Sequence, residues 1–370
     1  MRVGVLVLMA GREAGGPETY EVEMLRALAA IDRDNEYVVY CTGEEAPRAI
    51  GVVQDNFRYS VLTPRSRAIS LTMSLPARLL RDGVDFLHST FTPPPLAVRP
   101  EMLTMHCLSS FVHPEFYSPL IAWRLNNLLR LGMRRSKCVL CVSQSTADDV
   151  HARFGVERDR LAVAHNGVSP KFHPVDRSTA AALNRDRLGI DGPYALFVGK
   201  LEPRKNVMRL LDAFARFKRQ TRSDTRLLLA GNRTQVTPRI ERQIADLGIG
   251  DAVIQPGYVP SELLTPLYSA ARMFLLPSLW EGFGIPIVEA MACGTPVLTS
   301  NVTCLPEVAG DAAVIVDPHS ADSIAEGIAR LDSSQSLRDT LAKRGLARAG
   351  LFTWDNSARA TRAAYQRMTH

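Results

Sequence analysis

Residues 275–298 read LLPSLWEGFGIPIVEAMACGTPVL, and this stretch decides the fold. An apolar strand ends at Pro277, a short loop follows, and a helix is expected over 285–292. A parallel strand that passes through a tight loop into a helix is the unit of doubly wound α/β sheets. Glycines beside a helix N-terminus present backbone N–H groups, so the loop predicts a site for a phosphate or a sugar oxygen. The residues expected to line it are Gly282, Phe283, Gly284 and Ile285.

Two carboxylates flank the start of this helix. Glu281 lies in the loop, and Glu289 follows eight residues later, just over one helical turn from the helix start. Carboxylates accept hydrogen bonds from hydroxyls, so two that face one ligand suit a ribose and a sugar ring. The alternative is that Glu281 is a first-turn acid favoured by the helix dipole and Glu289 a solvated side chain.

The alternation of short apolar strands and amphipathic helices extends along the whole chain. A chain of 370 residues exceeds the usual size of a single core, so two domains are expected. We predict an α/β fold with two doubly wound, Rossmann-like domains that face a shared cleft. The N-terminal, acceptor-side domain covers 1–170 and is completed by a C-terminal helix over 353–370; a linker spans 171–192, and the C-terminal domain covers 193–350.

The predicted strands are 3–9, 37–40, 86–89, 103–106, 138–142, 161–164, 194–198, 226–230, 252–255, 273–276, 296–298 and 313–316. The predicted helices are 18–31, 70–81, 120–134, 146–154, 207–220, 238–247, 262–270, 285–292 and 353–368.

A basic turn follows the strand at 194–198. The sequence FVGKLEPRKNV at 197–207 places Arg204 and Lys205 between a strand and a helix, where fixed cations reach a diphosphate. Cations aimed at a leaving group stabilise the charge that builds on it in the transition state. The alternative is a solvated basic turn, which the helix dipole disfavours unless an anion joins it.

These motifs resemble retaining glycosyltransferases of family four, which have the GT-B fold. Glu281 to Glu289 looks like the family's E-x7-E element, which implies that Glu289 binds the donor ribose and that Glu281 lies near the transferred sugar. The segment that begins at Gly199 is similar to the phosphate-binding G-x-L-x-x-x-K-N element. By the same resemblance Gly15 and Gly16 form a glycine loop at the donor phosphates, and Tyr258 and Val259 line the base pocket.

His106 ends a strand in a segment similar to the family's His-Asp element, although Cys107 stands where the Asp is usual. The resemblance implies that His106 binds a hydroxyl of the donor sugar or of the acceptor; the alternative is a structural histidine. The nearby His113-Pro114-Glu115 resembles a mannosyltransferase-like branch. Together with the frequency of this donor in the family, this favours GDP-mannose, with UDP-glucose or UDP-N-acetylglucosamine as alternatives.

The expected reaction needs no metal and no cofactor, because no D-x-D stands at a strand end and no His/Cys/Asp cluster is spaced for a metal. The nucleotide sugar is a co-substrate, and a glycan or a polyprenyl-linked saccharide is the expected acceptor. Same-face attack would give retention. The rival interpretations are an epimerase or phosphorylase of the same fold, and a nucleotide-sugar-binding protein without transferase activity.

Composition limits the partners and the location. A net charge of +6 is too small an excess to suggest nucleic-acid binding. Six scattered cysteines favour a reducing compartment, and the apolar run at 3–10 is read as a buried strand rather than a cleaved leader. Residues 116–147 hold five basic residues and no acid, which is typical of helices on anionic membranes or of a solvated crossover helix. We expect a cytoplasmic protein, with a possible contact at the inner face of the membrane.

Overall fold

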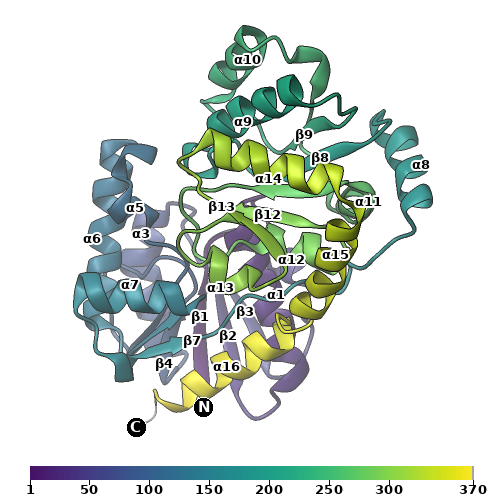
Figure 1. Cartoon of the computed structure of the whole chain (residues 1–370). Helices are drawn as coiled ribbons and strands as arrows, with labels where there is room; N and C mark the ends of the chain where they lie inside the picture. Colours follow the sequence, from purple (N-terminus) through teal and green to yellow (C-terminus); the bar gives the residue numbers. More distant parts are fainter. Residues whose placement is uncertain (369–370) are drawn as a thin grey trace. The chain divides into compact units, whose positions relative to one another are not determined.

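The computed structural model describes residues 1–368 and divides the chain into two compact units (Figure 1). Unit 1 comprises Met1–Gly167 and the segment from Thr353 onward, and unit 2 comprises Val168–Phe352. Each unit contains one sheet of parallel strands with helices packed on it. The predicted two-domain α/β fold is therefore confirmed.

Unit 1 contains a seven-stranded sheet in the order β3-β2-β1-β4-β5-β6-β7. The interior strand β1 has two neighbours, and its Val5 pairs with Val39 of β2 on one side and with His88 of β4 on the other. The strands are β1 (Arg2–Val7), β2 (Glu36–Cys41), β3 (Phe57–Val61), β4 (Phe86–Ser89), β5 (Glu101–Met105), β6 (Cys138–Cys141) and β7 (Leu161–Val163). The edge strand β3 was not predicted, because Arg58 and Ser60 interrupt its apolar pattern.

Both faces of this sheet are covered. Successive side chains of a strand point to opposite faces, so Val5 of β1 joins the core beneath α1 (Gly16–Ile31) while Leu6 joins the core beneath α4 (Leu75–Arg81). The remaining helices of unit 1 are α2 (Ala46–Ile50), α3 (Arg67–Ile69), η1 (Ser70–Ser74), α5 (Ser109–Val112), η2 (Pro114–Phe116), α6 (Pro119–Arg135), α7 (Gln144–Phe154), η3 (Arg158–Arg160) and α16 (Trp354–Gln366).

The helix predicted over 70–81 is not one regular helix. The structure has a π-helical turn, η1, before α4, and Pro76 lies in the first turn of α4. Proline has no N–H to donate to the preceding turn, so the regular hydrogen-bond ladder cannot run unbroken through it.

Unit 2 contains a six-stranded sheet in the order β10-β9-β8-β11-β12-β13. Helices α9 and α14 pack against each other, as do α12 and α15 (Figure 1). The strands are β8 (Tyr194–Val198), β9 (Arg226–Ala230), β10 (Val253–Gly257), β11 (Met273–Leu276), β12 (Val297–Ser300) and β13 (Ala313–Val316). The helices are α8 (Arg177–Leu188), η4 (Pro203–Lys205), α9 (Val207–Gln220), α10 (Thr237–Asp246), η5 (Gly250–Ala252), α11 (Ser261–Ala270), α12 (Ile285–Ala292), α13 (Leu305–Ala309), α14 (Ala321–Ser333) and α15 (Gln335–Ala349).

The stretch predicted as a linker, 171–192, contains the helix α8 and belongs to unit 2. The side chain of Asp176 caps this helix by accepting a hydrogen bond from the Thr179 amide, and Gly189 ends it in a left-handed conformation. The helix packs on α11. Proline and glycine therefore flank a helix here and do not mark an unstructured connection.

The C-terminal helix α16 packs on α1 within unit 1. Its Trp354 and Tyr365 are buried in the same core as Tyr20, and burying a side chain of this size stabilises by about 2–3 kcal/mol. The backbone at Gly167 lies so close that a Cβ there would stand 2.2 Å from the Trp354 nitrogen. The helix was predicted within 353–370, of which 369 and 370 lie outside the described residues.

Candidate functional site

In unit 2 the loops after β8 and β11 bring a carboxylate and two cations together. Glu281 is buried, and it accepts hydrogen bonds from Arg204 Nη1 at 2.7 Å and from Lys205 Nζ. Ser278 Oγ donates to the same carboxylate at 2.9 Å. The predicted residues Arg204, Lys205 and Glu281 thus form one cluster at the carboxyl edge of the sheet, where doubly wound sheets bind ligands.

The cluster keeps Glu281 ionised. Burial by itself would raise the pKa of Glu281, but the charges of Lys205 and Arg204 outweigh it and lower the pKa to about 2. Burial also lowers the pKa of Lys205, and the neighbouring Glu281 opposes that shift. A buried charge is tolerated when it is paired and hydrogen-bonded, and all three groups meet that condition.

Asn206 fixes the basic turn against the rest of unit 2. It adopts a left-handed conformation with φ 63°, and its side-chain amide donates to the carbonyls of Pro277 at 2.9 Å and Pro318 at 2.7 Å. The backbone adds a bond from the Leu279 amide to the Arg204 carbonyl at 2.8 Å. Sequence reasoning assigned no role to Asn206 or Ser278, although both stand inside the quoted motifs.

Gly199 directly follows β8, and its backbone lies against Gly231 in the loop after β9. A Cβ on Gly231 would lie 1.9 Å from the Gly199 carbonyl oxygen, so only glycine fits at position 231. This approach brings the turn after β9 against the turn that leads to Arg204.

Glu289 has a different environment. It lies in the middle of α12, is half-buried, and accepts a hydrogen bond from the Tyr268 hydroxyl at 2.9 Å. Burial raises its pKa, while Tyr268, Lys171 and Lys205 oppose the rise. The two glutamates thus have separate partners, and Lys205 acts electrostatically on both. No sequence pattern identified Tyr268 or Lys171.

The remaining residues of unit 2 that were predicted to bind the donor lie on loops at the same edge or, for Ile285, at the start of α12. Gly284 has φ 85° and precedes α12, which has no side-chain cap on its first turn. Gly282, Phe283, Gly284 and Ile285 are all buried. Tyr258 and Val259 follow β10, the former with an exposed side chain and the latter buried.

In unit 1 the glycine loop lies between β1 and α1. Gly15 has φ 74°, which favours glycine, and α1 begins at Gly16. Two glutamates of α1 hold the preceding turn. Glu18 accepts hydrogen bonds from the Gly11, Arg12 and Ala14 amides, and the buried Glu21 accepts from those of Leu8, Met9 and Ala10. These hydrogen bonds fix the loop to α1.

His106 directly follows β5, at the carboxyl edge of the unit 1 sheet. Its Nε2 lies 2.7 Å from the Thr90 carbonyl, which can only accept, so Nε2 carries the hydrogen. Burial lowers the pKa of His106 to about 4, against the opposing effect of that bond. The ring packs edge-on to Tyr20 at 4.6 Å between centroids. His106 is therefore neutral at pH 7, with Nδ1 as its acceptor nitrogen.

A buried chain of neutral groups lies behind His106. His88 Nδ1 is 2.8 Å from the Tyr365 hydroxyl, and His88 Nε2 is 2.7 Å from the Thr104 hydroxyl, which in turn lies 3.0 Å from that of Tyr20. Burial, with a smaller effect of His106, lowers the pKa of His88 to about 3. The chain ties α16 to β4 and β5.

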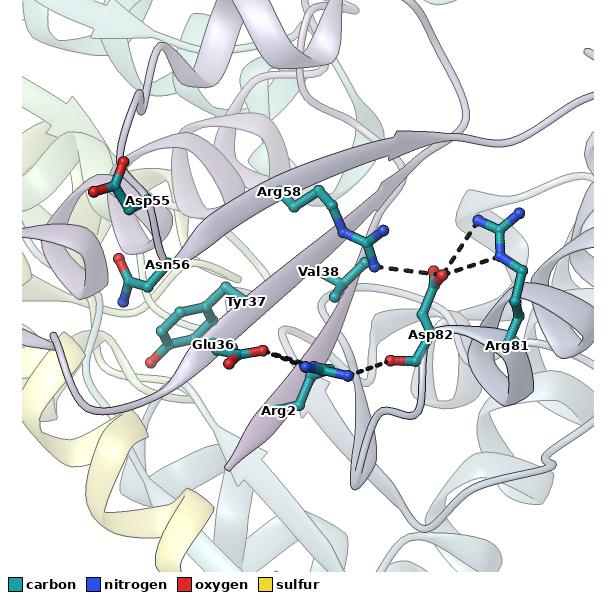
Figure 2. A pocket seen from close by; sticks show the side chains of 9 residues that line it. All are labelled: Arg2, Glu36, Tyr37, Val38, Asp55, Asn56, Arg58, Arg81 and Asp82. Carbon is teal, nitrogen blue, oxygen red and sulfur yellow. Dashed lines mark hydrogen bonds and ion pairs between the residues drawn. The ribbon is translucent and has the colours of Figure 1, made fainter.

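A further pocket in unit 1 lies at the opposite edge of the sheet, among the amino ends of β1, β2 and β3 (Figure 2). Arg58 and Arg81 both contact one oxygen of Asp82, at 3.3 and 3.2 Å, and Arg2 pairs with Glu36 at 2.7 Å. With Asp55, which also lines the pocket, three carboxylates balance the three arginines, and the amino edge is not where parallel sheets bind ligands. We assign this pocket no function.

Residues 1–368, which the structure describes, contain neither a membrane-spanning helix nor a metal-binding cluster. No helix there is long and apolar enough to cross a bilayer. No group of three or more His, Cys, Asp or Glu residues is arranged to hold a metal ion.

Each α/β unit places loops at the carboxyl ends of its parallel strands, the edge at which doubly wound sheets bind small ligands. Comparison with known proteins identifies the family. The model of glycosyl transferases group 1 matches residues 182–348, and that of Glycosyltransferase Family 4 matches residues 14–172. O-antigen chain mannosyltransferase B of Escherichia coli is 35% identical over 313 residues, which cover 83% of this chain and 79% of the relative. The chain belongs to the family-four, group 1 glycosyltransferases.

Other similarities are partial or structural. Serotype-specific mannosyltransferase WbdA of Escherichia coli is 29% identical over 60% of this chain, but the match covers 28% of that longer relative. The structure of Anabaena HepE in complex with UDP and glucose has a TM-score of 0.78 and 21% identity, and covers 99% of each chain. At that identity the likeness supports the GT-B fold alone.

Proposed function

We propose that this glycosyltransferase moves a hexose, mannose from GDP-mannose, to a hydroxyl of a glycan or lipid-linked saccharide, with retention of configuration and without a metal. The observation that carries the proposal is the cluster of Arg204, Lys205 and Glu281 at the carboxyl edge of unit 2. This arrangement suits a ligand whose negative charge grows during reaction.

The cations would act on the leaving diphosphate. As the bond between the anomeric carbon and the phosphate oxygen breaks, negative charge builds on the leaving group. The ammonium of Lys205 has three N–H donors, and one of them donates a hydrogen bond to Glu281. Cations held in advance by the protein stabilise that charge without reorganising.

We assign Glu281 the role of a positioning residue. Its carboxylate is buried, and Arg204, Lys205 and Ser278 take up its oxygens, so it orients the cations. This modifies the role implied by the family resemblance, which put Glu281 beside the transferred sugar. Glu289, half-buried and held by Tyr268, suits the donor ribose.

Retention would follow from attack on the face that the diphosphate leaves. The acceptor oxygen forms a bond to the anomeric carbon, the bond to the phosphate oxygen breaks, and the acceptor proton passes to the departing phosphate. The products are a glycoside and a nucleoside diphosphate. No protein nucleophile is needed, which is consistent with Glu281 being occupied by its cations.

His106 suits recognition of a hydroxyl. A neutral ring whose Nε2–H is bound to Thr90 presents Nδ1 as an acceptor for a sugar or acceptor hydroxyl. Mannose is favoured as the sugar because the relative with the widest match reported above is named a mannosyltransferase, and that relative's O-antigen polymer suggests a polysaccharide acceptor.

The test is donor turnover and thermal stabilisation of the purified full chain with GDP-mannose, UDP-glucose and UDP-N-acetylglucosamine, each with and without EDTA. Lys205→Ala and Glu289→Ala are compared with Lys343→Ala and Glu326→Ala, which change exposed residues of the same unit. Removing one group that stabilises transition-state charge costs about 100- to 1000-fold in kcat, so this loss is expected for Lys205→Ala.

The expected result is that GDP-mannose raises the Tm and is turned over despite EDTA, with both controls like the wild type. The anomeric coupling in the NMR spectrum of the product would report retention. Turnover that EDTA abolishes, an inverted product, or stabilisation by a UDP-sugar alone would each overturn the matching part of the proposal.

A further inference from the structure

Helix α6 of unit 1 exposes large apolar side chains on its first turns. Leu120, Ile121 and Trp123 are 73%, 57% and 67% exposed, and Leu131 is exposed further along the helix. The opposite side of the helix is buried through Ala122, Leu129 and Met133. The helix thus has an inner apolar side that packs in unit 1 and an outer apolar side that the described residues leave uncovered.

Arginines accompany these residues on the outer side. Arg124, Arg130 and Arg134 are exposed, and residues 116–147 contain no acid to neutralise them. Arg135 is different, because it pairs with the buried Glu101 at 2.7 Å and donates to the carbonyls of Pro94 and Pro95. The structure therefore removes Arg135 from the group that the sequence suggested for a membrane contact.

The apolar end of α6 lies towards the carboxyl edge of the sheet. The chain runs from the end of β5 through α5 and η2 into α6, and from the end of α6 to the start of β6. The first turns of α6 are therefore near the end of β5, next to His106. Asn126 donates to the Ser110 carbonyl at 2.9 Å, which holds α6 against α5. A surface contacted by these first turns would therefore adjoin the ligand-binding edge of unit 1.

The segment after β3 extends this surface. Arg67 of α3 donates to the Leu8 carbonyl at 2.7 Å, just after β1, and lies within electrostatic reach of Arg124. Its neighbours Ile69 and Met73 expose apolar side chains. We define the α6 surface as Ile69, Met73, Leu120, Ile121, Trp123, Arg124, Arg130, Leu131 and Arg134.

We infer that the α6 surface binds an anionic phospholipid bilayer and so brings unit 1 to a lipid-linked acceptor. Leucine, isoleucine and tryptophan enter the boundary between headgroups and acyl chains, and arginines beside them pair with lipid phosphates. The absence of acids over 116–147 gives the charge complementarity that an anionic bilayer requires. The bilayer contact does not depend on the proposed donor, but the lipid-linked acceptor rests on the proposed transferase function.

Vesicle binding of the full chain tests the bilayer contact. Vesicles of phosphatidylglycerol and phosphatidylethanolamine are compared with vesicles of phosphatidylcholine, by co-sedimentation at low and high salt. Of the three tryptophans, Trp123 is exposed, Trp280 is half-buried in unit 2 and Trp354 is buried, so insertion of the α6 surface should shift the emission of Trp123 to the blue. Trp123→Phe should abolish most of that shift while the chain still sediments with anionic vesicles.

Substitutions separate the apolar and charged parts. Leu120→Gln with Trp123→Gln should remove binding, and Arg124→Gln with Arg134→Gln should weaken it about fivefold for each arginine, the equivalent of about 1 kcal/mol each. Val53→Gln, at a side chain 99% exposed, and Arg48→Gln, also exposed, are the matched controls in unit 1 and should bind like the wild type. Circular dichroism and melting curves check that every variant folds.

Equal binding by the wild type and the α6 variants, or no preference for anionic vesicles, would overturn the inference. A concentration-dependent dimer that Trp123→Gln dissolves would assign the surface to a second copy of the chain. Donor hydrolysis in detergent-free solution, measured on the same variants, separates this outcome from a failure of the proposed reaction, because none of these residues belongs to the candidate site.

Discussion

The two units share a parallel α/β architecture but place different polar groups around their candidate site residues. In unit 2 these groups are charged and paired, with Glu281 held between Arg204 and Lys205. Around His106 in unit 1 they are neutral, with His88 between Tyr365 and Thr104, and His106 on the Thr90 carbonyl. One fold thus supports a site surrounded by ions and a site surrounded by neutral groups.

This difference agrees with the roles proposed above, in which unit 2 binds the diphosphate and His106 of unit 1 binds a hydroxyl. A diphosphate gains negative charge as it leaves, so cations on unit 2 are useful only if the protein can keep them there before the donor binds, which Glu281 does. A hydroxyl carries no charge, and a neutral histidine recognises it without the cost of burying an ion.

The largest effect is expected when one charge is removed from the buried cluster of unit 2. Glu281→Gln keeps the shape of the side chain but leaves Lys205 buried without its carboxylate. Removing one partner of a buried pair costs about 3–5 kcal/mol, so the denaturant midpoint of the unit 2 transition should fall strongly. The measurement is chemical denaturation followed by circular dichroism and intrinsic fluorescence.

The matched control is the double variant Glu281→Gln with Lys205→Met. Removing both charges should restore much of the lost stability, because the penalty comes from the unpaired ion. If the two single losses simply add in the double variant, the groups are not coupled, and the pairing described here would be wrong as an energetic statement.

Much of this comparison could be predicted from the sequence. Strands such as β8, β9 and β11 have the predicted bounds, because short apolar runs bounded by polar residues and glycine mark buried parallel strands. Glu281 meets Arg204 and Lys205 because parallel topology aligns loops from distant parts of the chain at one edge. The sequence predicted that both motifs contact the donor, but it did not predict this direct contact between them.

Contacts made by ordinary-looking residues could not be predicted. Tyr268, which binds Glu289, and Tyr365, which binds His88, are single aromatic residues in amphipathic helices and fit a core pattern equally well. The helix α8 was missed because Gly189, which ends it, was interpreted together with Gly192 and the nearby prolines as a break in the pattern. Such details depend on packing between elements far apart in sequence.

A smaller effect should appear when the pH is lowered. The pKa of His88 is about 3 in the folded chain and about 6.5 when unfolded, so below pH 6.5 the unfolded state binds the additional proton. The folded state should lose stability as the pH falls from 6.5 towards 3, by about 2 kcal/mol at pH 5 from this histidine.

The charged cluster of unit 2 should behave differently over this range. Glu281 has a lowered pKa of about 2, so its contribution is complete above the unfolded value near 4.5 and is lost only as the pH falls towards 2. Denaturation at pH 7, 6 and 5 should therefore lower the unit 1 transition more than that of unit 2. In His88→Gln the slope with pH should become shallower, and an unchanged slope would show that His88 is not the group that titrates.

The smallest effect is expected when one hydrogen bond is removed from the buried neutral groups Tyr365, His88 and Thr104. Tyr365→Phe removes the hydroxyl that binds His88 and should cost about 1 kcal/mol, the net worth of one buried hydrogen bond. Tyr258→Phe is the control, since that side chain is exposed and its change should alter the stability little.

A double-mutant cycle that combines Tyr365→Phe with Thr104→Val would then decide whether the two hydrogen bonds of His88 are coupled. A coupling near zero would mean two separate bonds, whereas a sizeable coupling would mean that α16 and β5 are linked through His88, so that loosening the C-terminal helix also alters the strand that carries His106.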